Sequence, residues 1–472
     1  MKRKTKVICT IGPASESEEM IRKLILAGMD CARLNFSHGT HEEQRKKIEA
    51  IKKVRADLHL PIAIMLDTKG PEYRIKTFEN HKIELKDGDT FTFTTDDVEG
   101  NQERVAVSFN HLTDNLVKGD RILVNNGLVI FEVKEIKGND AICTCIAGGT
   151  LSDRKSMNFP NKVLDHPFLS DQDKEDILFG LKHGIDFVAA SFVSTKADVQ
   201  AIRDFLDEHD GNDVEIIAKI ENRSGVDHIE EICEIADGVM IARGDLGVEI
   251  PNIEVPSIQK YLINKCRMLG SRVITATEML ESMIQNPRPT RAEISDVANA
   301  VYDGTSAVML SGESANGKYP VEAVETMVKT VVFTENQIHY KKRFRNADFD
   351  VTSNLDAVSH SVCQMAIDVN AKAIVVNSLS GRTSRMVSRF RCPVDIIGMT
   401  TSTRVWRKQN LSWGVTPVLC GTYDNMEEMF LNSVHEAKVT FDLKSGDNIV
   451  LTGGVLNGTS GNTNLIKVET VE

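Results

Sequence analysis

Two consecutive apolar runs in the middle of the chain each end abruptly in charged side chains. The first run leads into Lys219 and Glu221, and the second leads into Arg243 and Asp245. Because a strand that is buried on both faces reads as a continuous apolar run, these charges mark the carboxyl ends of two strands. Carboxylates suit a hard divalent cation, and Lys and Arg suit an anion such as phosphate. The two strand ends therefore predict an enzyme that handles phosphates through a metal ion.

Similar apolar runs recur along the first two thirds of the chain, with helical patterns between most of them. Eight strands are predicted at residues 7–11, 31–36, 62–66, 187–192, 215–220, 238–242, 272–276 and 307–310. Eight strands that are each followed by a crossover helix predict an α/β fold, closed as a (β/α)8 TIM barrel. An open, doubly wound sheet is the alternative.

One connection of this barrel and the end of the chain follow other patterns. Between the third and fourth strands, β patterns separated by turn signals replace the helical period, which predicts an inserted β-barrel lid domain at residues 70–171. After a charged connector, further strands at 373–376, 394–398, 416–419 and 448–452 predict a C-terminal α/β open-sheet domain at 345–472. The catalytic barrel then comprises residues 1–69 and 172–344.

The active sites of such barrels lie at the carboxyl ends of the strands. Nearly every predicted strand places polar side chains there. They are Arg33, Asn35, Ser37, Asp67, Thr68, Lys69, Ser191, Lys219, Glu221, Arg243, Asp245, Thr275, Thr277, Ser311 and Glu313. The chain has no Walker loop, no G-x-G-x-x-G and no G-x-S-x-G motif. Cations, carboxylates and Thr without a clear nucleophile fit phosphoryl transfer, in which positioning and charge neutralisation carry the catalysis.

Several of these residues also have a purely structural interpretation. Arg243 either clamps a neighbouring carboxylate or contacts substrate. Ser37 could be a helix N-cap. Together with Asn35, Asp67 and Thr68, Ser37 forms an all-oxygen group that could hold a monovalent cation or could serve only for hydrogen bonding.

Composition narrows the class of protein. The 472 residues carry a net charge of −12, which disfavours nucleic acid as a partner, and no apolar stretch is long enough for a membrane span. Among nine scattered cysteines only Cys143 and Cys145 lie close together, and without a second pair they are expected to be structural. His38 and His41 lack an obvious metal-binding partner, so surface or capping roles are expected. The chain is predicted to be cytoplasmic.

Seven longer motifs occur in a fixed order along the chain. They are RLNFSH at 33–38, LDTKGPE at 66–72, KIEN at 219–222, ARGDLGVEIP at 242–251, TAT at 275–277, NPRPTRAE at 286–293 and MLSGES at 309–314. In this order they resemble the pyruvate kinase family, and the likeness runs over the whole chain. It is to bacterial members without an extra C-terminal phosphohistidine-like domain. The family plan of barrel, inserted lid and C-terminal α/β domain agrees with the predicted organisation.

The resemblance implies transfer of the phosphoryl group of phosphoenolpyruvate to ADP, which gives pyruvate and ATP. By the family pattern Glu221 and Asp245 bind Mg²⁺ (or Mn²⁺), Lys219 neutralises the transferring group, and Arg33 contacts it. Gly244, Asp245 and Thr277 would hold the carboxylate end of the substrate. The enolate would then be protonated through Thr277 and water.

The resemblance also assigns nucleotide, potassium and effector positions. Arg74 and, in the lid, Lys155 would reach ADP or ATP, and Glu72 stands where potassium-dependent members carry glutamate. The K⁺ ligands would be Asn35, Ser37, Asp67 and Thr68. A sugar-phosphate or nucleotide effector would bind near Ser378, Ser380, Gly381, Arg382 and Thr383, with further contacts from the glycine-rich segment 458–461, although ordinary turns that cap a helix explain these residues as well. The family also implies a homotetramer.

A few positions depart from the family pattern. Glu278 replaces the usual glutamine, and Ser306 replaces an expected aspartate. In the lid, Asn125 and Asn126 replace two aspartates, and Ser156 and Asn161 replace glycines around Lys155. None of these changes removes a metal ligand or Lys219.

Two rival functions share parts of this inventory. A barrel lyase or aldolase that acts through a Mg²⁺-bound enolate would share the carboxylate pair but would not need a lid with nucleotide contacts. A degenerate effector-binding regulator is disfavoured because the metal and lysine positions are intact.

Overall fold

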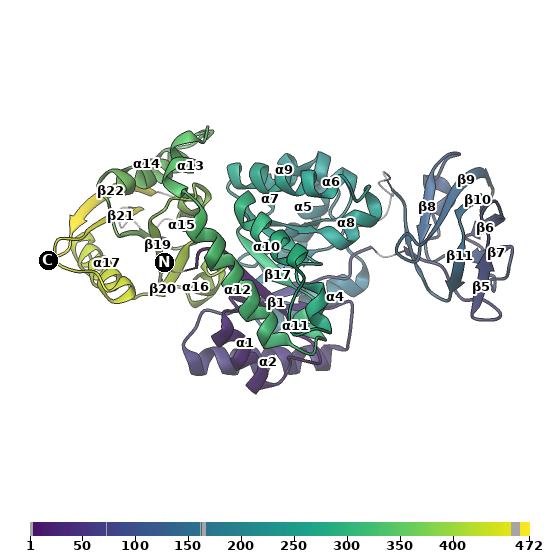
Figure 1. Cartoon of the computed structure of the whole chain (residues 1–472), viewed down its shortest axis with the longest axis horizontal. Helices are drawn as coiled ribbons and strands as arrows, with labels where there is room; N and C mark the ends of the chain where they lie inside the picture. The colour runs from purple at the N-terminus through teal and green to yellow at the C-terminus, as the bar shows by residue number, and fades with distance from the viewer. Residues whose placement is uncertain (1–2, 72, 161, 163–166, 455–462) are drawn as a thin grey trace.

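The computed structural model describes residues 3–71, 73–160, 162, 167–454 and 463–472, and it contains three bodies in a row (Figure 1). The central body is a closed barrel of eight parallel strands in the order β1-β17-β16-β15-β14-β13-β3-β2. Its strands are β1 (Lys6–Thr10), β2 (Cys31–Asn35), β3 (Ala63–Asp67), β13 (Phe187–Ala190), β14 (Glu215–Ile220), β15 (Gly238–Ala242), β16 (Arg272–Ala276) and β17 (Ala307–Leu310). The predicted barrel is therefore confirmed, and the open-sheet alternative is wrong.

Helices surround this barrel and cover the outward faces of its strands (Figure 1). They are α1 (Glu18–Ala27), α2 (His41–Leu58), α4 (Asp171–Lys182), α5 (Lys196–Glu208), α6 (Arg223–Asp227), α7 (Ile229–Ile235), α8 (Arg243–Glu249), α9 (Val255–Met268), α10 (Arg291–Asp303), α11 (Gly312–Ala315) and α12 (Pro320–Gln337), with a 3₁₀ turn at Glu281–Ile284. Several begin at strong caps. Thr290, for example, accepts a hydrogen bond from the Glu293 N–H while the Glu293 carboxylate accepts one from the Thr290 N–H, which is the capping box expected from the sequence.

The barrel strands alternate between two apolar environments. Inward-facing side chains such as Ile8, Met65, Ile217 and Met240 form one buried cluster inside the barrel. Their sequence neighbours, such as Ile216, pack outward against the helices in a much larger cluster. Because successive residues of a strand point to opposite faces, every second residue continues the inner face up to the barrel mouth.

The segment between β3 and α4 forms the second body, drawn at the right of Figure 1. It contains a seven-stranded sheet in the order β4-β12-β8-β9-β10-β6-β7 and a two-stranded sheet of β11 and β5. The elements are β4 (Tyr73–Arg74), β5 (Lys82–Leu85), β6 (Thr90–Thr94), β7 (Arg104–Ala106), α3 (Leu112–Asn115), β8 (Arg121–Val124), β9 (Val129–Lys137), β10 (Asp140–Ala147), β11 (Gly149–Ser152) and β12 (Ser156–Asn158). This body has its own apolar core, and Cys143 and Cys145 are packed in it as structural residues.

The third body, at the left of Figure 1, follows the connecting helix α13 (Tyr340–Asn346). Its five-stranded sheet has the order β20-β19-β18-β21-β22. The elements are α14 (Asn354–Asp368), β18 (Ala373–Asn377), α15 (Arg382–Arg389), β19 (Asp395–Thr400), α16 (Thr403–Gln409), β20 (Val415–Leu419), α17 (Met426–Phe441), β21 (Asn448–Gly454) and β22 (Thr463–Thr470). The last strand pairs antiparallel to β21 and was not predicted.

The two ends of the barrel have different neighbours. At the amino ends of the strands, Lys6 Nζ donates to the Val415 carbonyl (2.8 Å) and Arg272 Nε donates to Ser412 Oγ (3.0 Å), both in the third body. The carboxyl ends face the inserted sheets. No helix in the described parts of the chain is long and apolar enough to cross a lipid bilayer.

Candidate active site

A cavity of about 470 Å³ lies between the barrel mouth and the inserted sheets. This volume is in the usual range for small-molecule sites. Predicted residues in its lining are Arg33, Asn35, Ser37, Asp67, Lys69, Arg74, Ser191, Lys219, Glu221 and Asp245. The lid contributes Asn126, Ser156 and Asn158. The structure thus brings most of the strand-end residues to one place.

Strand alternation explains how Lys219 reaches this cavity. Ile217 belongs to the cluster inside the barrel, so Lys219 and Glu221 continue the same inward face of the chain toward the mouth. The same period carries β3 from Met65 to Asp67 and β2 from Cys31 to Arg33. A face that is apolar inside the barrel becomes charged at the mouth.

Lys219 is the centre of the polar network. Its ammonium donates to Ser191 Oγ (2.7 Å) and Asp67 Oδ1 (3.1 Å) and lies 3.0 Å from Glu221 Oε1. Burial alone would lower the pKa of this lysine, but the charges of Asp67 and Glu221 outweigh burial and raise the pKa well above its usual value. The side chain is therefore a fixed, buried positive charge.

Asp67 joins Lys219 to Arg33. The Arg33 Nε donates to Asp67 Oδ2 (2.5 Å), and another Arg33 nitrogen donates to Thr10 Oγ1 (3.0 Å). Burial would raise the pKa of Asp67, but the two neighbouring cations lower it below its usual value. The Arg33 guanidinium is held on one side and lines the cavity on the other.

The carboxylates of Glu221 and Asp245 face the same cavity. Glu221 Oε2 accepts the Phe192 N–H (2.6 Å), and Oε1 is buried with the Lys219 ammonium 3.0 Å away. Burial raises the pKa of Glu221 to about 7, with a further increase from Asp245 that the nearby Lys219 partly offsets. Asp245 is exposed to the cavity. Two carboxylates that face one cavity supply the oxygen ligands that a hard divalent cation prefers, so the residues present suit the implied metal.

The 276–278 segment is held in an unusual backbone conformation. Thr277 and Glu278 have φ values of 67° and 53°, and positive φ is strained for a β-branched residue such as threonine. Thr277 Oγ1 accepts the Gly244 N–H (2.8 Å), which ties it to the residue before Asp245. Thr277 and Gly244 lie beside the cavity lining rather than in it.

Arg243 supports this segment. Its guanidinium donates to the Thr277 carbonyl (2.6 Å), to Asp296 (2.7 Å) and to Gln259 (3.2 Å). These partners hold it away from the cavity, in whose lining it does not take part. The sequence left two interpretations of Arg243, a clamp on a neighbouring carboxylate or a contact to substrate. The geometry agrees with the clamp.

The four oxygen-bearing residues of the predicted potassium group lie together, but they also bond to protein groups. Asn35 Oδ1 accepts the Ser37 N–H (3.0 Å), and Thr68 Oγ1 accepts the Ser191 N–H (3.2 Å). Both oxygens retain further acceptor capacity. Glu72, on which the expected potassium dependence rests, lies outside the described residues.

Lid residues approach the cavity unevenly. Arg74 lines it, and one of its guanidinium nitrogens also donates to the Arg154 carbonyl (2.6 Å). Lys155 lies directly before β12 and is not part of the lining, whereas Lys162, which the sequence did not single out, is. Lys162 pairs with Asp120 at 2.8 Å. The sequence offered little reason to select Lys162, because it is a single lysine in a segment without strand or helix periodicity.

The departures in the lid have local causes. Asn125 and Asn126 adopt φ values of 57° and 55° in the turn between β8 and β9, a conformation that asparagine tolerates well. The Ser156 hydroxyl donates to Asn126 Oδ1 (3.1 Å) and so closes this turn onto β12. Asn161 lies outside the described residues.

The predicted effector loop precedes α15. Ser378 Oγ accepts the Gly381 N–H (3.0 Å), Ser380 Oγ accepts the Arg382 N–H (3.4 Å), and Gly381 has φ 77°. Thr383 Oγ1 shares a hydrogen bond with Thr463 Oγ1 (2.6 Å). Both interpretations, a phosphate cradle and a capping turn, agree with these contacts. The glycine-rich segment 458–461 lies outside the described residues.

His41 has a side-chain partner that the sequence did not reveal. His41 does have a carboxylate partner, since its Nε2 lies 2.6 Å from Asp176 Oδ1, and its ring stacks on Phe179. The partner is 135 residues away, so spacing in the sequence could not show it. His38 lines the cavity.

The closed barrel, the sheets inserted after its third strand and the C-terminal α/β body define a three-part (β/α)8-barrel protein with a charged site at the barrel mouth. The family model of the pyruvate kinase barrel domain matches residues 2–324, and that of the pyruvate kinase alpha/beta domain matches residues 356–469. The chain belongs to the pyruvate kinase family, as the sequence motifs predicted.

Individual relatives agree with this assignment. The chain is 45% identical to a pyruvate kinase of Clostridium acetobutylicum over all of both chains. It is 46% identical to one of Geobacillus stearothermophilus, with all of this chain and 81% of the relative covered. A crystal structure of a pyruvate kinase from Cryptosporidium parvum superposes with a TM-score of 0.94 at 39% identity, covering all of this chain and 96% of the other.

Proposed function

We propose that this chain is the pyruvate kinase of glycolysis, which transfers the phosphoryl group of phosphoenolpyruvate to ADP and yields pyruvate and ATP. The observation that carries the proposal is the buried ammonium of Lys219, fixed by Ser191, Asp67 and Glu221 at the mouth of a family barrel. The names of the relatives support the same activity.

Lys219 is the cation that stabilises the transferring phosphoryl group. It is held before substrate arrives, so little reorganisation is needed as charge develops in the transition state. Its raised pKa keeps it protonated at neutral pH. Arg33 contacts the same phosphoryl group from β2, with Asp67 holding both cations in place.

Glu221 and Asp245 would hold Mg²⁺ or Mn²⁺. When bound, such an ion offsets negative charge on the phosphoryl oxygens and orients the substrate. Gly244, Asp245 and Thr277 hold the carboxylate end of phosphoenolpyruvate, and Thr277 with water delivers a proton to the enolate. Its hydroxyl donates to the Ala276 carbonyl (2.6 Å) and accepts from Gly244, so its orientation is set before the reaction.

The remaining assignments concern ligands around this centre. Asn35, Ser37, Asp67 and Thr68 bind K⁺, and Arg74 and Lys155 contact ADP or ATP once the lid approaches the barrel. We also propose the domain boundaries after residues 69, 171 and 344, a cytoplasmic homotetramer, and regulation by a sugar phosphate or nucleotide at Ser378–Thr383 (residues 378–383).

A coupled assay for ATP formation from ADP and phosphoenolpyruvate, with K⁺ and Mg²⁺ varied independently, tests the activity. We expect ATP only with the divalent ion and faster turnover with K⁺. Pyruvate released without ATP would favour the lyase alternative, and no turnover under any ionic condition or effector would contradict the proposal.

Lys219→Met tests the role of the lysine. We expect kcat to fall by at least about three orders of magnitude, with a much smaller change in phosphoenolpyruvate affinity, because the charge acts mainly in the transition state. Lys174→Met is the matched control, since the Lys174 side chain is 44% exposed on the outer helix α4. Equal losses of binding and turnover in Lys219→Met would contradict this role.

A further inference from the structure

A second cavity, of about 490 Å³, lies where the barrel meets the C-terminal body. Its lining includes Arg267 at the end of α9, Lys342 and Arg343 on α13, and Arg391 after α15. We call these four side chains the cationic cluster. In a chain with a net charge of −12, four cations around one small cavity are a local reversal of charge.

The cationic cluster is bonded to neutral groups. Arg391 is only 6% exposed and donates to the carbonyls of Gly304 (2.9 Å) and Ser388 (2.7 Å) and to Ser306 Oγ (3.0 Å). Arg343 donates to the Tyr302 carbonyl (2.6 Å). None of these acceptors is ionised, so the hydrogen bonds themselves do not neutralise the positive charges.

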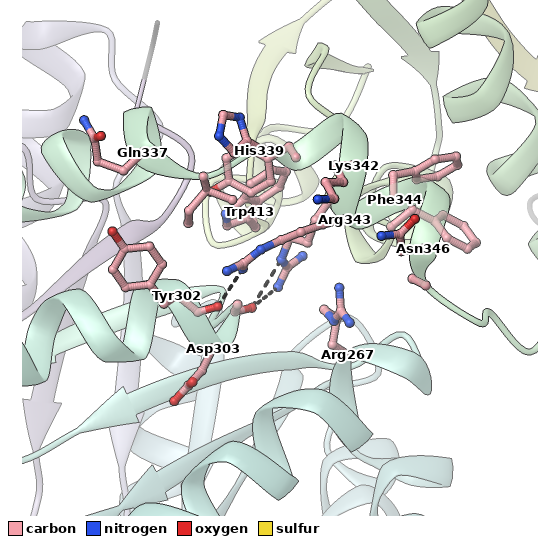
Figure 2. A pocket seen from close by; sticks show the side chains of 16 residues that line it. Arg267, Tyr302, Asp303, Gln337, His339, Lys342, Arg343, Phe344, Asn346 and Trp413 are labelled. Carbon is pink, nitrogen blue, oxygen red and sulfur yellow. Dashed lines mark hydrogen bonds between the residues drawn. The ribbon is translucent and has the colours of Figure 1, made fainter.

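Arg267 has a buried hydrogen-bond donor that lacks a partner in the described parts of the chain. One of its terminal nitrogens donates to Asn264 Oδ1 (3.0 Å), whereas its Nε is buried without a hydrogen-bond partner in the described structure. Figure 2 shows Arg267 pointing from α9 toward the space below Arg343 and Lys342. An unsatisfied buried donor is costly, and a ligand oxygen is the natural partner for it.

Nearby carboxylates are engaged elsewhere. Asp303 lines the cavity, but it accepts from Lys260 (2.5 Å) and Gln259 (3.2 Å) and points away from the cationic cluster in Figure 2. The Glu335 carboxylate accepts the backbone N–H groups of Lys4 (2.9 Å) and Thr5 (2.6 Å). In the described parts of the chain, no carboxylate forms an ion pair with the cationic cluster.

The electrostatics agree with this geometry. Burial, followed by the charge of Arg343, lowers the pKa of Arg267. Burial and the charge of Arg267 lower the pKa of Arg391 to about 9. Ser306 helps to leave the charge of Arg391 without a carboxylate partner among the described residues. It replaces the aspartate of the family pattern, and its neutral hydroxyl is what Arg391 contacts.

We propose that the cationic cluster binds a phosphate group, either as inorganic phosphate or as a phosphate monoester. The forked donors of several arginines match a tetrahedral dianion, and the arrangement supplies donors from three separate segments. The volume leaves room for an organic part beside the aromatic rings of Phe344, Phe390 and Trp413. A ligand here bridges the barrel and the C-terminal body.

Trp413 provides a reporter inside the cavity. The chain has two tryptophans, so Trp406→Phe leaves Trp413 alone, with the Arg391 guanidinium 4.9 Å from its ring centre. In this background, combined with Arg33→Gln to weaken phosphate binding at the candidate active site, inorganic phosphate and phenyl phosphate are titrated at constant ionic strength. We expect a saturable change in Trp413 emission.

Ser306→Asp is the decisive variant, because it places a carboxylate beside Arg391, and Ser306→Asn is its neutral control. We expect phosphate affinity to fall by about tenfold or more in Ser306→Asp and to change little in Ser306→Asn. Arg267→Gln should weaken binding similarly, whereas Lys341→Gln, an exposed lysine outside the lining, should not. Circular dichroism confirms that each variant is folded.

The outcomes separate the alternatives. Tighter binding of phenyl phosphate identifies a monoester site, and tighter binding of inorganic phosphate identifies a site for the free ion. Absence of a saturable signal with both probes, or equal affinities in Ser306→Asp and Ser306→Asn, would overturn the proposal.

Discussion

Arg243 allows a sharp test of how the barrel mouth is built. Its guanidinium holds the Thr277 carbonyl at 2.6 Å and Asp296 at 2.7 Å, while Thr277 has φ 67°. A hydrogen bond that involves a charged group contributes roughly 1.5–3 kcal/mol, and a strained backbone conformation stores about 1–3 kcal/mol. Because the Asp296 side chain is 31% exposed, the contribution of its ion pair to the free energy of unfolding is reduced by solvent screening.

We therefore expect Arg243→Gln to lower the free energy of unfolding by roughly 2–4 kcal/mol and to release the strained conformation of Thr277. Loss of position at a reacting group costs on the order of 10²-fold in kcat. The Michaelis constant for phosphoenolpyruvate should change much less, since Arg243 does not line the cavity. Arg243→Lys keeps the charge but not the forked donors. Its free energy of unfolding and its kcat should therefore lie between those of the native chain and those of Arg243→Gln.

Urea unfolding and steady-state kinetics on the same preparations measure both effects. Arg22→Gln is the matched control, because Arg22 forms an exposed ion pair with Asp57 and should lose less than about 1 kcal/mol. A large rise in the Michaelis constant with unchanged kcat in Arg243→Gln would show direct substrate contact. That result would refute the clamp.

Two further predictions concern the barrel's two ends. In Gly70→Ala the new Cβ would lie 2.7 Å from Ser191 Cβ at φ 71°, so we expect kcat to fall about tenfold or more, whereas Gly88→Ala, with φ 89° and open space, should keep full activity. At the other end, burial opposes ionisation of Glu215, but Arg272 and neighbouring cations lower its pKa from 4.5 to about 2. This carboxylate stabilises the fold above pH 4.5, by about 3 kcal/mol, and that contribution is lost as pH falls toward 2. Acid titration of the unfolding free energy should show this loss in the native chain and not in Glu215→Gln.

The barrel was predictable because its strands are buried on both faces and therefore appear as uninterrupted apolar runs. The polar residues that follow each run then mark the mouth, which is how Lys219 and Asp245 were found, together with Arg243. Strand β22 was missed because its exposed and half-buried residues alternate without a continuous apolar run. It is an edge strand, and its position depends on pairing with β21.

Contacts between distant segments could not be predicted from the sequence. Two partners of Arg243 come from α9 and α10, and Ser191, which lies 28 residues before Lys219, approaches it from the end of β13. Each of these contacts depends on how the elements pack around the closed barrel. A single sequence contains no information on the distances between such elements. The cationic cluster is the extreme case, because Arg267 and Arg391 belong to different bodies.

The same two helices connect the candidate active site with the cationic cluster. Arg243 contacts α9 at Gln259 and α10 at Asp296, and the far end of α9 carries Arg267 into the second cavity. The last turn of α10 lines that cavity as well. From Gln259 to Arg267 the helix rises only about 12 Å, at 1.5 Å per residue. A phosphate bound by the cationic cluster would therefore contact the ends of the two helices that hold the clamp on Thr277.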